Sequence, residues 1–175
     1  MMIEPINTVQ QQVVRDVTAA CLHRAGEICG REFPPIPVSF DLSGRAAGMY
    51  RVRYGRRGIR YNPYLFARYF DDGLTATVPH EVAHYVTDLL YGLHNVRPHG
   101  VEWQAVMRSL GAEPRATGDY DLTGVPVRRQ RRYAYACDCT THRLTTRRHN
   151  KVHRGEALYR CRRCGVPLVF SGPPE

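Results

Sequence analysis

The amino-acid sequence predicts an α+β domain followed by a small β-rich module that binds a metal ion. Three observations support this fold class. A long helical pattern precedes short strands and further helices, the residues His80-Glu81-Val82-Ala83-His84 fall in one of those helices, and the last forty residues contain closely spaced cysteines. We expect a compact first domain at 1–115, a basic connector at 116–132 and a zinc ribbon at 133–175.

Apolar residues at helical spacing predict a long first helix that is interrupted at Gly26 and closed by Gly30. Three prolines between residues 34 and 37 then exclude a helix. The predicted buried stripe of the first helix consists of Ile6, Val9, Val13, Val17, Ala20 and Ile28.

Short strands follow, at Val38–Leu42, Met49–Arg53 and Ile59–Tyr61, joined by turns that contain glycine. Asn62 and Pro63 are a typical N-cap and first-turn pair, so they predict the start of a helix that stops near residue 73. These elements give the first domain enough apolar residues for a core of its own.

The helix that carries the histidine motif is expected to begin with a cap at Thr75 or Thr77, with Pro79 tolerated in its first turn. Gly92 is its expected end. A further helix, with apolar periodicity from Val101 to Leu110, should end at residue 111.

The pattern His80-Glu81-Val82-Ala83-His84 indicates metal-dependent hydrolysis. Positions 80 and 84 project from one face of a helix, one turn apart, so both imidazoles can reach the same metal ion. Glu81 lies beside the first histidine, where it can act as a base for a water molecule on the metal. Five residues of this kind also occur by chance, so the interpretation depends on a third protein ligand.

Four downstream residues are candidates for that ligand: Asp88, His94, His99 and Glu102. A metzincin would have a histidine at position 90, where this chain has leucine. We favour His99 because it stands at the start of a returning helix. Glu102, one turn later, is expected to support a ligand or to be the ligand itself. His94 is expected to be an exposed loop residue.

Longer stretches of the chain resemble the SprT family, which includes the Spartan-type proteases. The resemblance rests on the residues Thr77–His84 and His99–Trp103. It extends over nearly the whole chain, into the stretches 147–151, 154–156 and 159–165.

This resemblance implies a compact zincin domain of minimal gluzincin type, with a small sheet, an HExxH helix and a zinc ribbon behind it. It implies zinc ligands at His80, His84 and His99 and a general base at Glu81. Eukaryotic members of the family degrade proteins crosslinked to DNA. The resemblance implies a zinc metalloendopeptidase but does not supply the substrate of the bacterial members, and we expect proteins in association with DNA, of the DNA-protein crosslink type.

The charge of the chain is distributed asymmetrically. Residues 126–175 contain 12 Lys and Arg against 3 Asp and Glu, whereas residues 1–125 contain 13 of each, so the formal excess of +9 belongs to the last fifty residues. Such a segment binds polyanions through phosphate contacts, and we favour DNA as the partner. A merely solvated basic surface is the alternative. The expected contacts are Arg128, Arg129, Arg131, Arg132, Arg147, Arg148, Lys151, Arg154, Arg162 and Arg163.

A structural zinc site is expected in the same segment, in addition to the catalytic zinc. Its donors are Cys137, Cys139, Cys161 and Cys164, with His142 as an alternative to the first of them. Knuckle spacing favours the histidine, because Cys139 and His142 repeat the spacing of the second pair, and the prevalence of thiolate ligands favours four cysteines.

We expect a cytoplasmic protein without membrane contact. The first ten residues lack the apolar run of a secretory signal, and no apolar stretch is long enough to span a bilayer. The alternative function is a nucleic-acid-binding zinc-ribbon protein whose histidine site is vestigial or structural. A metal closed by a fourth side chain, such as His94 or Glu102, would favour that alternative.

Overall fold

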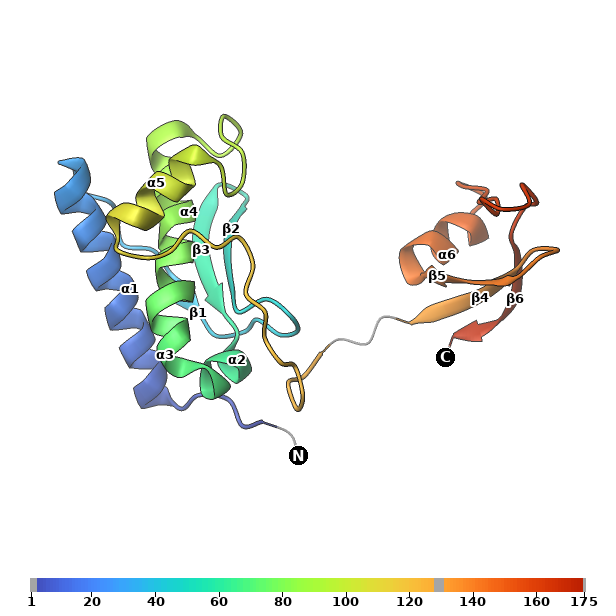
Figure 1. Ribbon diagram of the computed structural model, residues 1–175, viewed down its shortest axis with the longest axis horizontal. Coiled ribbons are helices and arrows are strands. Elements are labelled where there is room, and N and C mark those ends of the chain that lie inside the picture. Colours follow the sequence, from blue (N-terminus) through green and yellow to red (C-terminus); the bar gives the residue numbers. More distant parts are fainter. Residues whose placement is uncertain (1–2, 128–130, 175) are drawn as a thin grey trace. The chain divides into compact units, whose positions relative to one another are not determined.

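The computed structural model describes residues 3–127 and 131–174 (Figure 1). The chain forms two compact units, Met1–Val127 and Arg128–Glu175. The first unit is a mixture of helices and a small sheet, and the second contains a three-stranded sheet with one helix. The α+β class is therefore confirmed. Residues 116–127, in the predicted connector, belong to the first unit.

Helix α1 (Thr8–Cys29) starts with a capping box. The Asn7 side chain accepts a hydrogen bond from the N–H of Gln10, and the Gln10 side chain accepts one from the N–H of Asn7. Gly30 ends the helix in the left-handed conformation, with φ at 63°, as expected. The expected interruption at Gly26 is wrong, because the helix continues through it.

The buried face of α1 also differs from the predicted stripe. It consists of Val14, Thr18, Leu22 and Ala25, whereas Val9 is 72% exposed. Two series of residues at helical spacing run along this helix. The series that packs against the core contains Thr18. The Thr18 hydroxyl donates to the carbonyl of Val14 at 2.7 Å and lies 3.1 Å from the hydroxyl of Tyr61. The Thr18 hydroxyl therefore has hydrogen-bond partners inside the core. A pattern of apolar residues alone does not reveal such a buried polar side chain.

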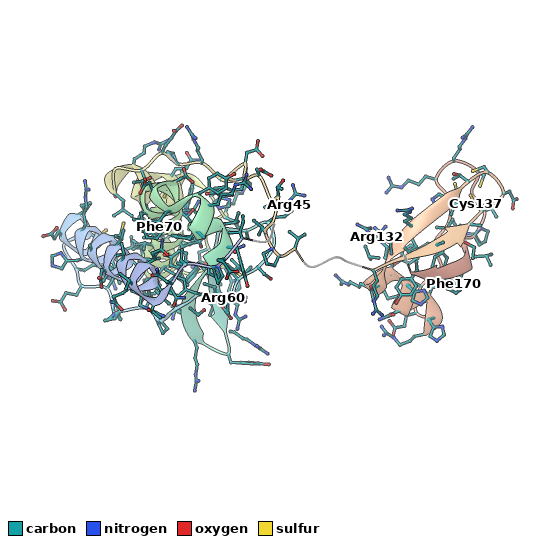
Figure 2. All side chains as sticks on the ribbon, turned by 90° about the horizontal axis from the view of Figure 1, so that it is seen from below. Arg45, Arg60, Phe70, Arg132, Cys137 and Phe170 are labelled. Carbon is teal, nitrogen blue, oxygen red and sulfur yellow. The ribbon has the colours of Figure 1, made fainter. Side chains whose placement is uncertain are left out.

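The sheet of the first unit has the order β1-β3-β2, with β1 (Val38–Ser39) parallel to β3 (Arg56–Tyr61) and β2 (Gly48–Arg53) antiparallel to it. The first strand is shorter than the predicted Val38–Leu42. The hairpin of β2 and β3 projects beyond the helices of its unit (Figure 2). β2 is an edge strand, so one row of its backbone groups has no partner in the sheet.

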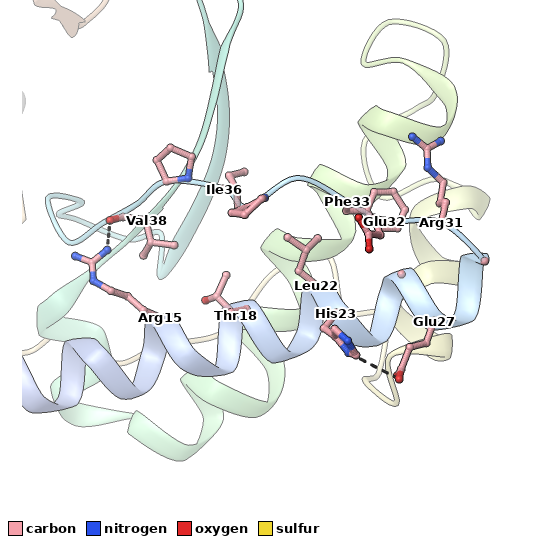
Figure 3. Close-up of a pocket in the computed structure, with 15 residues that line it drawn as sticks. Arg15, Thr18, Leu22, His23, Glu27, Arg31, Glu32, Phe33, Ile36 and Val38 are labelled. Carbon is pink, nitrogen blue, oxygen red and sulfur yellow. Dashed lines mark hydrogen bonds and ion pairs between the residues drawn. The ribbon is translucent and has the colours of Figure 1, made fainter.

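A cavity of about 790 Å³ lies between α1 and the segment 31–38 that leads into β1 (Figure 3). Its apolar wall includes Leu22, Phe33 and Ile36. The guanidinium of Arg15, which also lines the cavity, donates a hydrogen bond of 2.5 Å to the carbonyl of Val38. None of the predicted metal-binding residues lines this cavity, so it is separate from the histidine motif.

Helix α2 (Pro63–Arg68) begins as predicted at Asn62. The Asn62 side-chain oxygen accepts hydrogen bonds from the N–H groups of Tyr64 and Leu65, at 3.1 and 3.3 Å. Pro63 occupies the first turn, where its missing N–H removes no helical hydrogen bond.

The chain then passes without a break through α3 (Phe70–Asp72) and the π-helical turn η1 (Gly73–Thr77) into α4 (Val78–Tyr91). The expected cap at Thr75 or Thr77 is wrong, because both residues lie in η1 and Thr77 has helical backbone angles without a capping bond. The N–H of Val78 donates to the carbonyl of Gly73, five residues earlier. Pro79 has no N–H to donate, and the wider turn before it accommodates that loss.

Helix α4 is the centre of the first unit and packs against α1, η1, the sheet and α5 (Val101–Ser109). Gly92 ends α4 with φ at 86°, at the expected position. The core around α4 includes the fully buried residues Val78, Val82, Val86, Trp103 and Met107. Within the described ranges, no helix has the length and the apolar character that a bilayer span requires.

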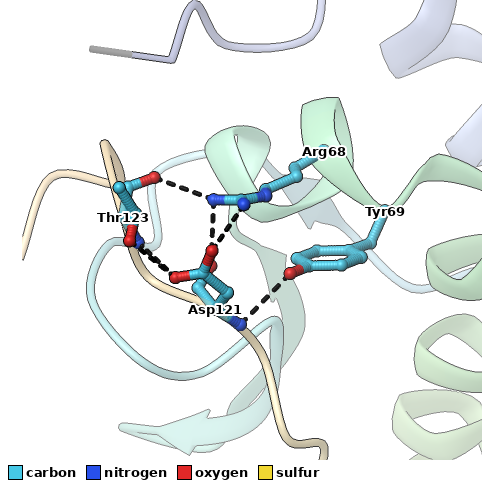
Figure 4. A network of polar contacts seen from close by, with 4 residues as sticks. All are labelled: Arg68, Tyr69, Asp121 and Thr123. Atoms are coloured by element: carbon cyan, nitrogen blue, oxygen red, sulfur yellow. Dashed lines mark hydrogen bonds and ion pairs between the residues drawn. The ribbon is translucent and has the colours of Figure 1, made fainter. Parts of the chain in front are cut away.

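Residues 116–127, which we call the strap, are bound to the first unit by polar contacts (Figure 4). Arg68 pairs with Asp121 at 2.5 Å and donates to the carbonyl of Thr123 at 2.9 Å. The hydroxyl of Tyr69 accepts a hydrogen bond from the N–H of Asp121. Tyr120 donates to Asp72 at 2.9 Å, beside the π turn. These contacts hold the strap against the first unit.

The second unit consists of β4 (Arg132–Ala136), β5 (Thr141–Thr145), α6 (Thr146–His153) and β6 (Val169–Pro174), with strand order β5-β4-β6. Its small core contains Tyr135, Leu144, Cys161 and Leu168. Phe170, on β6, is 48% exposed.

Candidate functional site

Three histidine side chains converge at the boundary between α4 and α5. His80 and His84 come from α4, and His99 precedes α5 by two residues. Their Nε2 atoms lie 3.2 Å apart for His80 and His84, 3.1 Å for His84 and His99, and 3.1 Å for His80 and His99. The structure therefore brings the favoured third ligand to the motif pair.

This triangle suits a metal ion better than a set of hydrogen bonds. A neutral Nε2 either donates or accepts, so at least one of three mutual contacts must join two groups of the same kind. Burial and the neighbouring histidines lower the pKa of His80 to about 4 and of His84 to about 3, and burial lowers the pKa of His99. All three are therefore neutral at pH 7, as metal ligation requires. Tetrahedral zinc with bonds of about 2.0–2.1 Å needs nitrogens about 3.3 Å apart, close to the observed edges.

Trp103 supports all three rings and is a residue that the sequence interpretation missed. Its indole is 1% exposed, and its ring centroid lies 4.7, 5.5 and 4.7 Å from those of His80, His84 and His99. Its Nε1–H donates to the carbonyl of His80 at 3.2 Å. Its position in the sequence, one helical turn after His99 and on the face that packs against α4, could have indicated this role.

His99 has a strained backbone, with φ at 57°. Left-handed angles at a residue other than glycine cost about 1–3 kcal/mol and persist where the surroundings impose them. Here Gln104 donates a hydrogen bond to the carbonyl of His99 at 3.1 Å. The strain turns the chain so that its imidazole meets the pair on α4.

Glu81 is buried between α4 and the edge strand β2, with 4% of its surface exposed. The N–H of Tyr50 donates to its Oε2 at 2.5 Å. Burial raises the pKa of Glu81 to about 8, and the Tyr50 N–H opposes that rise. A cation at the histidines would lower the pKa further. Gly48 leaves room for the carboxylate, since a Cβ there would come within 2.5 Å of its Oε1.

Asp88, a candidate ligand in the sequence, instead fastens α4 to the hairpin. Its Oδ2 accepts hydrogen bonds of 2.5 Å from the Tyr50 hydroxyl and 2.6 Å from Nε of Arg57. Burial on its own would raise the pKa of Asp88, but these bonds outweigh burial and lower it. Both partners are more than thirty residues away in sequence, so local reasoning could not find them.

The other two ligand candidates do not join the histidines. In the part of the chain that the structure describes, no further Cys, Asp, Glu or His contributes a ligand atom to the group. His94 is exposed, as expected. Glu102 lies in the first turn of α5, and no hydrogen bond from it to a histidine occurs among the described residues, so its supporting role stays a prediction.

The second metal-binding group is formed by four cysteine sulfurs within 4.8 Å of one another: Cys137, Cys139, Cys161 and Cys164. Two sulfur–sulfur distances, 3.5 Å from Cys137 to Cys139 and 3.7 Å from Cys139 to Cys161, match the roughly 3.8 Å of tetrahedral zinc thiolates. Backbone N–H groups of Cys164 and Arg163 lower the pKa of Cys161 to about 6. His142, the alternative donor, lies outside the group with its Nε2 3.3 Å from the sulfur of Cys137.

The second unit carries the predicted basic side chains on several elements. Arg147 and Arg148 are exposed on α6, Lys151 is half-buried there, Arg131 and Arg132 are exposed at the start of β4, and Arg162 and Arg163 are exposed between the last two cysteines. Arg154 is paired with Glu156 at 2.6 Å. The predicted contacts Arg128 and Arg129 lie outside the described residues.

Aromatic rings accompany these charges. Tyr133 and His149 stack with centroids 3.7 Å apart, and Phe170 lies 5.2 Å from His149. This cluster joins β4, α6 and β6 and leaves the Phe170 ring half-exposed. Exposed rings beside guanidinium groups offer stacking faces to unpaired bases.

Two family models match the chain. Residues 18–131 match the model of the SprT-like family, and residues 131–172 match that of the SprT-like zinc ribbon domain. Protein SprT of Vibrio atlanticus (strain LGP32) is 39% identical over 166 residues, which cover 94% of this chain and 96% of that protein. Protein SprT of Escherichia coli O157:H7 is 38% identical over 162 residues, 92% and 93% of the two chains.

A third relative, Protein SprT of Pseudomonas paraeruginosa (strain DSM 24068 / PA7), is 40% identical over 157 residues, which cover 87% of this chain and 91% of that protein. No solved structure matches the chain. The two family models together span most of the sequence, and these relatives align along nearly their full lengths. The chain belongs to the SprT-like family and carries its zinc ribbon domain.

Proposed function

We propose that the protein is a zinc-dependent metallopeptidase that cleaves proteins associated with DNA. The observation that carries the proposal is the triangle of His80, His84 and His99, which has three donors and, among the described residues, no fourth. Three protein ligands with one open position are typical of catalytic zinc, whereas structural zinc is closed by four. The cysteine group in the second unit is such a closed set. The proposed protein therefore uses one catalytic and one structural zinc ion.

His80, His84 and His99 would hold the zinc ion, which would supply Lewis-acid chemistry to a water molecule and to a peptide carbonyl. Glu81 takes the proton from the attacking water and passes it to the leaving amine. Burial raises the pKa of this carboxylate and a cation at the histidines would lower it, and this balance suits a group that must both accept and release a proton. Trp103 and Gln104 hold the histidines in place.

The edge strand β2 favours a polypeptide as the substrate of the proposed peptidase. An extended chain can add to a free sheet edge through backbone hydrogen bonds, without dependence on its side chains. Because Tyr50 of this strand bonds to Glu81, the free edge runs beside the proposed base. Flexible or locally unfolded proteins are therefore the favoured substrate class.

Metal content tests the catalytic zinc. Wild type should contain two zinc ions per chain, and His99→Ala should contain one and lose cleavage of a flexible protein such as denatured casein. His94→Ala is the matched control, since that exposed histidine lies outside the triangle, and it should keep both ions and full activity. Two ions in His99→Ala would contradict the site.

The second unit supports the association with DNA. It combines exposed arginines on α6 with the ring cluster of Tyr133, His149 and Phe170, so it offers both phosphate contacts and stacking faces. DNA should stimulate cleavage of a DNA-binding protein. The triple variant Arg147→Gln/Arg148→Gln/Lys151→Gln should lose that stimulation but retain cleavage of a substrate that does not bind DNA. Equal stimulation of wild type and the triple variant would show that these basic residues do not bring the enzyme to DNA.

The alternative function, a nucleic-acid-binding protein without peptidase activity, predicts tight DNA binding together with an inert histidine group. The absence of a fourth ligand among the described residues argues against a purely structural metal at that position.

A further inference from the structure

The β2–β3 hairpin is rich in arginine, although the formal net charge of residues 1–125 is zero. Residues 50–61 contain five arginines and no acidic residue. Two of the five are neutralised, Arg57 by Asp88 at 2.6 Å and Arg60 by Asp41 at 2.9 Å. The other three, which form no ion pair among the described residues, are Arg51, Arg53 and Arg56.

These three guanidinium groups share one exposed face. Side chains alternate along β2, so Arg51 and Arg53 point the same way, and the register sets Arg53 directly opposite Arg56. Like charges opposite each other on one face of a sheet destabilise the pairing. A solvated surface gains nothing from that repulsion, whereas a bound polyanion removes it.

The turn residue Tyr54 gives the second observation. The residue is 89% exposed, and its backbone is left-handed with φ at 49°, a conformation that a bulky residue rarely adopts. The guanidinium of Arg53 lies 5.0 Å from the centroid of the Tyr54 ring. Glycine would relieve the backbone strain at this position. The chain instead presents an aromatic face beside a cation at the end of the projecting hairpin.

We infer that these four residues, the hairpin surface (Arg51, Arg53, Tyr54 and Arg56), bind a nucleic-acid strand. The arginines contact phosphates, and the Tyr54 ring stacks on an unpaired base. An acidic polypeptide could occupy the arginines, but it would leave the exposed aromatic ring without a role. The nucleic acid is therefore the partner that accounts for both observations.

The hairpin surface begins at the residue after Tyr50, whose N–H bonds to Glu81. Arg51 and Arg53 alternate with Tyr50 along β2, so a strand bound here would lie on the face of the hairpin opposite the Tyr50 ring, independently of the basic residues of the second unit. Its consequence for cleavage rests on the proposed function, because only a peptidase would benefit from DNA held next to its substrate. The binding itself does not, so it can be tested without any activity.

The test is the affinity of the full-length protein for a labelled single-stranded oligonucleotide of mixed sequence, measured by fluorescence anisotropy over a range of salt. The hairpin variant is Arg51→Gln/Arg53→Gln/Arg56→Gln. The control, Arg24→Gln/Arg31→Gln/Arg108→Gln, removes the same charge from exposed positions of the same unit. The hairpin variant should bind at least ten-fold more weakly than the control at low salt. The slope of log affinity against log salt concentration should be smaller in magnitude by about two, because each of the three lost phosphate contacts contributes about 0.7.

Tyr54 provides an independent arm that leaves the charge unchanged. Tyr54→Ala should weaken binding about five-fold or more with an unaltered salt slope, and Tyr54→Phe should keep wild-type affinity. The inference is overturned if the hairpin and control variants bind alike. It is also overturned if the hairpin variant keeps oligonucleotide affinity but cleaves an acidic flexible protein more slowly, since the surface would then recognise polypeptide. Failure of the peptidase proposal would leave these binding results unaffected.

Discussion

The backbone N–H of Tyr50 and the carboxylate of Glu81 are joined by a hydrogen bond of 2.5 Å. The hydroxyl of the same tyrosine bonds to Asp88, two helical turns after Glu81. One residue of the edge strand therefore fastens α4 at two points. The proposed base is held in position by a neutral backbone group, and no ion pair holds it among the described residues.

Gly48 is required for this arrangement. A methyl group at this position would come within 2.5 Å of Oε1 and 2.6 Å of Cγ of Glu81, so the glutamate would have to move. Gly48→Ala should lower cleavage of a flexible protein at least ten-fold while both zinc ions stay bound. Gly58→Ala in β3 is the control, because its new methyl would meet only the Pro37 carbonyl at 3.5 Å. Equal activity of the two variants would show that Glu81 is free to shift.

Asp88 should contribute stability that depends on pH. Its pKa is lowered in the folded protein, so the interaction stabilises the fold above the unfolded value of about 3.9 and is lost as pH falls through the folded value. Asp88→Asn should lower the free energy of unfolding by about 1–3 kcal/mol at pH 7. Urea titrations should show this difference shrinking below about pH 4. Asp119→Asn, at an exposed strap position, should show little difference at either pH.

Thr87 should be replaceable with a gain in stability. Its buried hydroxyl has no hydrogen-bond partner among the described residues, whereas the buried hydroxyl of Thr18 has two. Thr87→Val should raise the free energy of unfolding by about 1 kcal/mol, and Thr18→Val should lower it by a similar amount. Urea midpoints with unchanged slopes measure both. A loss of stability in Thr87→Val would mean that this hydroxyl is satisfied in solution.

His142 should be dispensable for the ribbon metal. Its nitrogen lies 3.3 Å from the Cys137 sulfur but is not part of the four-sulfur group. His142→Ala should therefore retain two zinc ions per chain, whereas Cys139→Ala should retain one. Metal analysis after gel filtration distinguishes the two, and loss of an ion from His142→Ala would restore the histidine as a ligand.

Local patterns in the sequence were sufficient for the outline of the site. The pair His80 and His84 needs only helical periodicity, and His99 was favoured because a returning helix was expected to begin there. The Asn62 and Pro63 helix start depends on neighbouring residues alone, and it was correct. Cysteine prevalence and knuckle spacing gave opposite answers for His142, and the distances between sulfur atoms favour the four cysteines.

Features that depend on distant partners were not predictable in the same way. The position of Asp88, four residues past His84, predicts that it supports a ligand or is solvated, whereas its partners Tyr50 and Arg57 lie on the hairpin. The buried face of α1 was misassigned because Thr18 finds its partner in Tyr61, on a strand. The strap lies in the predicted connector, and only tertiary contacts, such as that of Arg68 with Asp121, fix its position.

Cleavage of a flexible protein by Glu81→Gln, compared with wild type, tests the central claim most directly. Glutamine has nearly the shape of glutamate and can still accept the Tyr50 N–H, but it cannot take a proton from water. With two zinc ions per chain verified in both proteins, the variant should lose at least a hundred-fold in cleavage rate. Cleavage by Glu81→Gln at a rate near that of wild type would contradict the proposed mechanism.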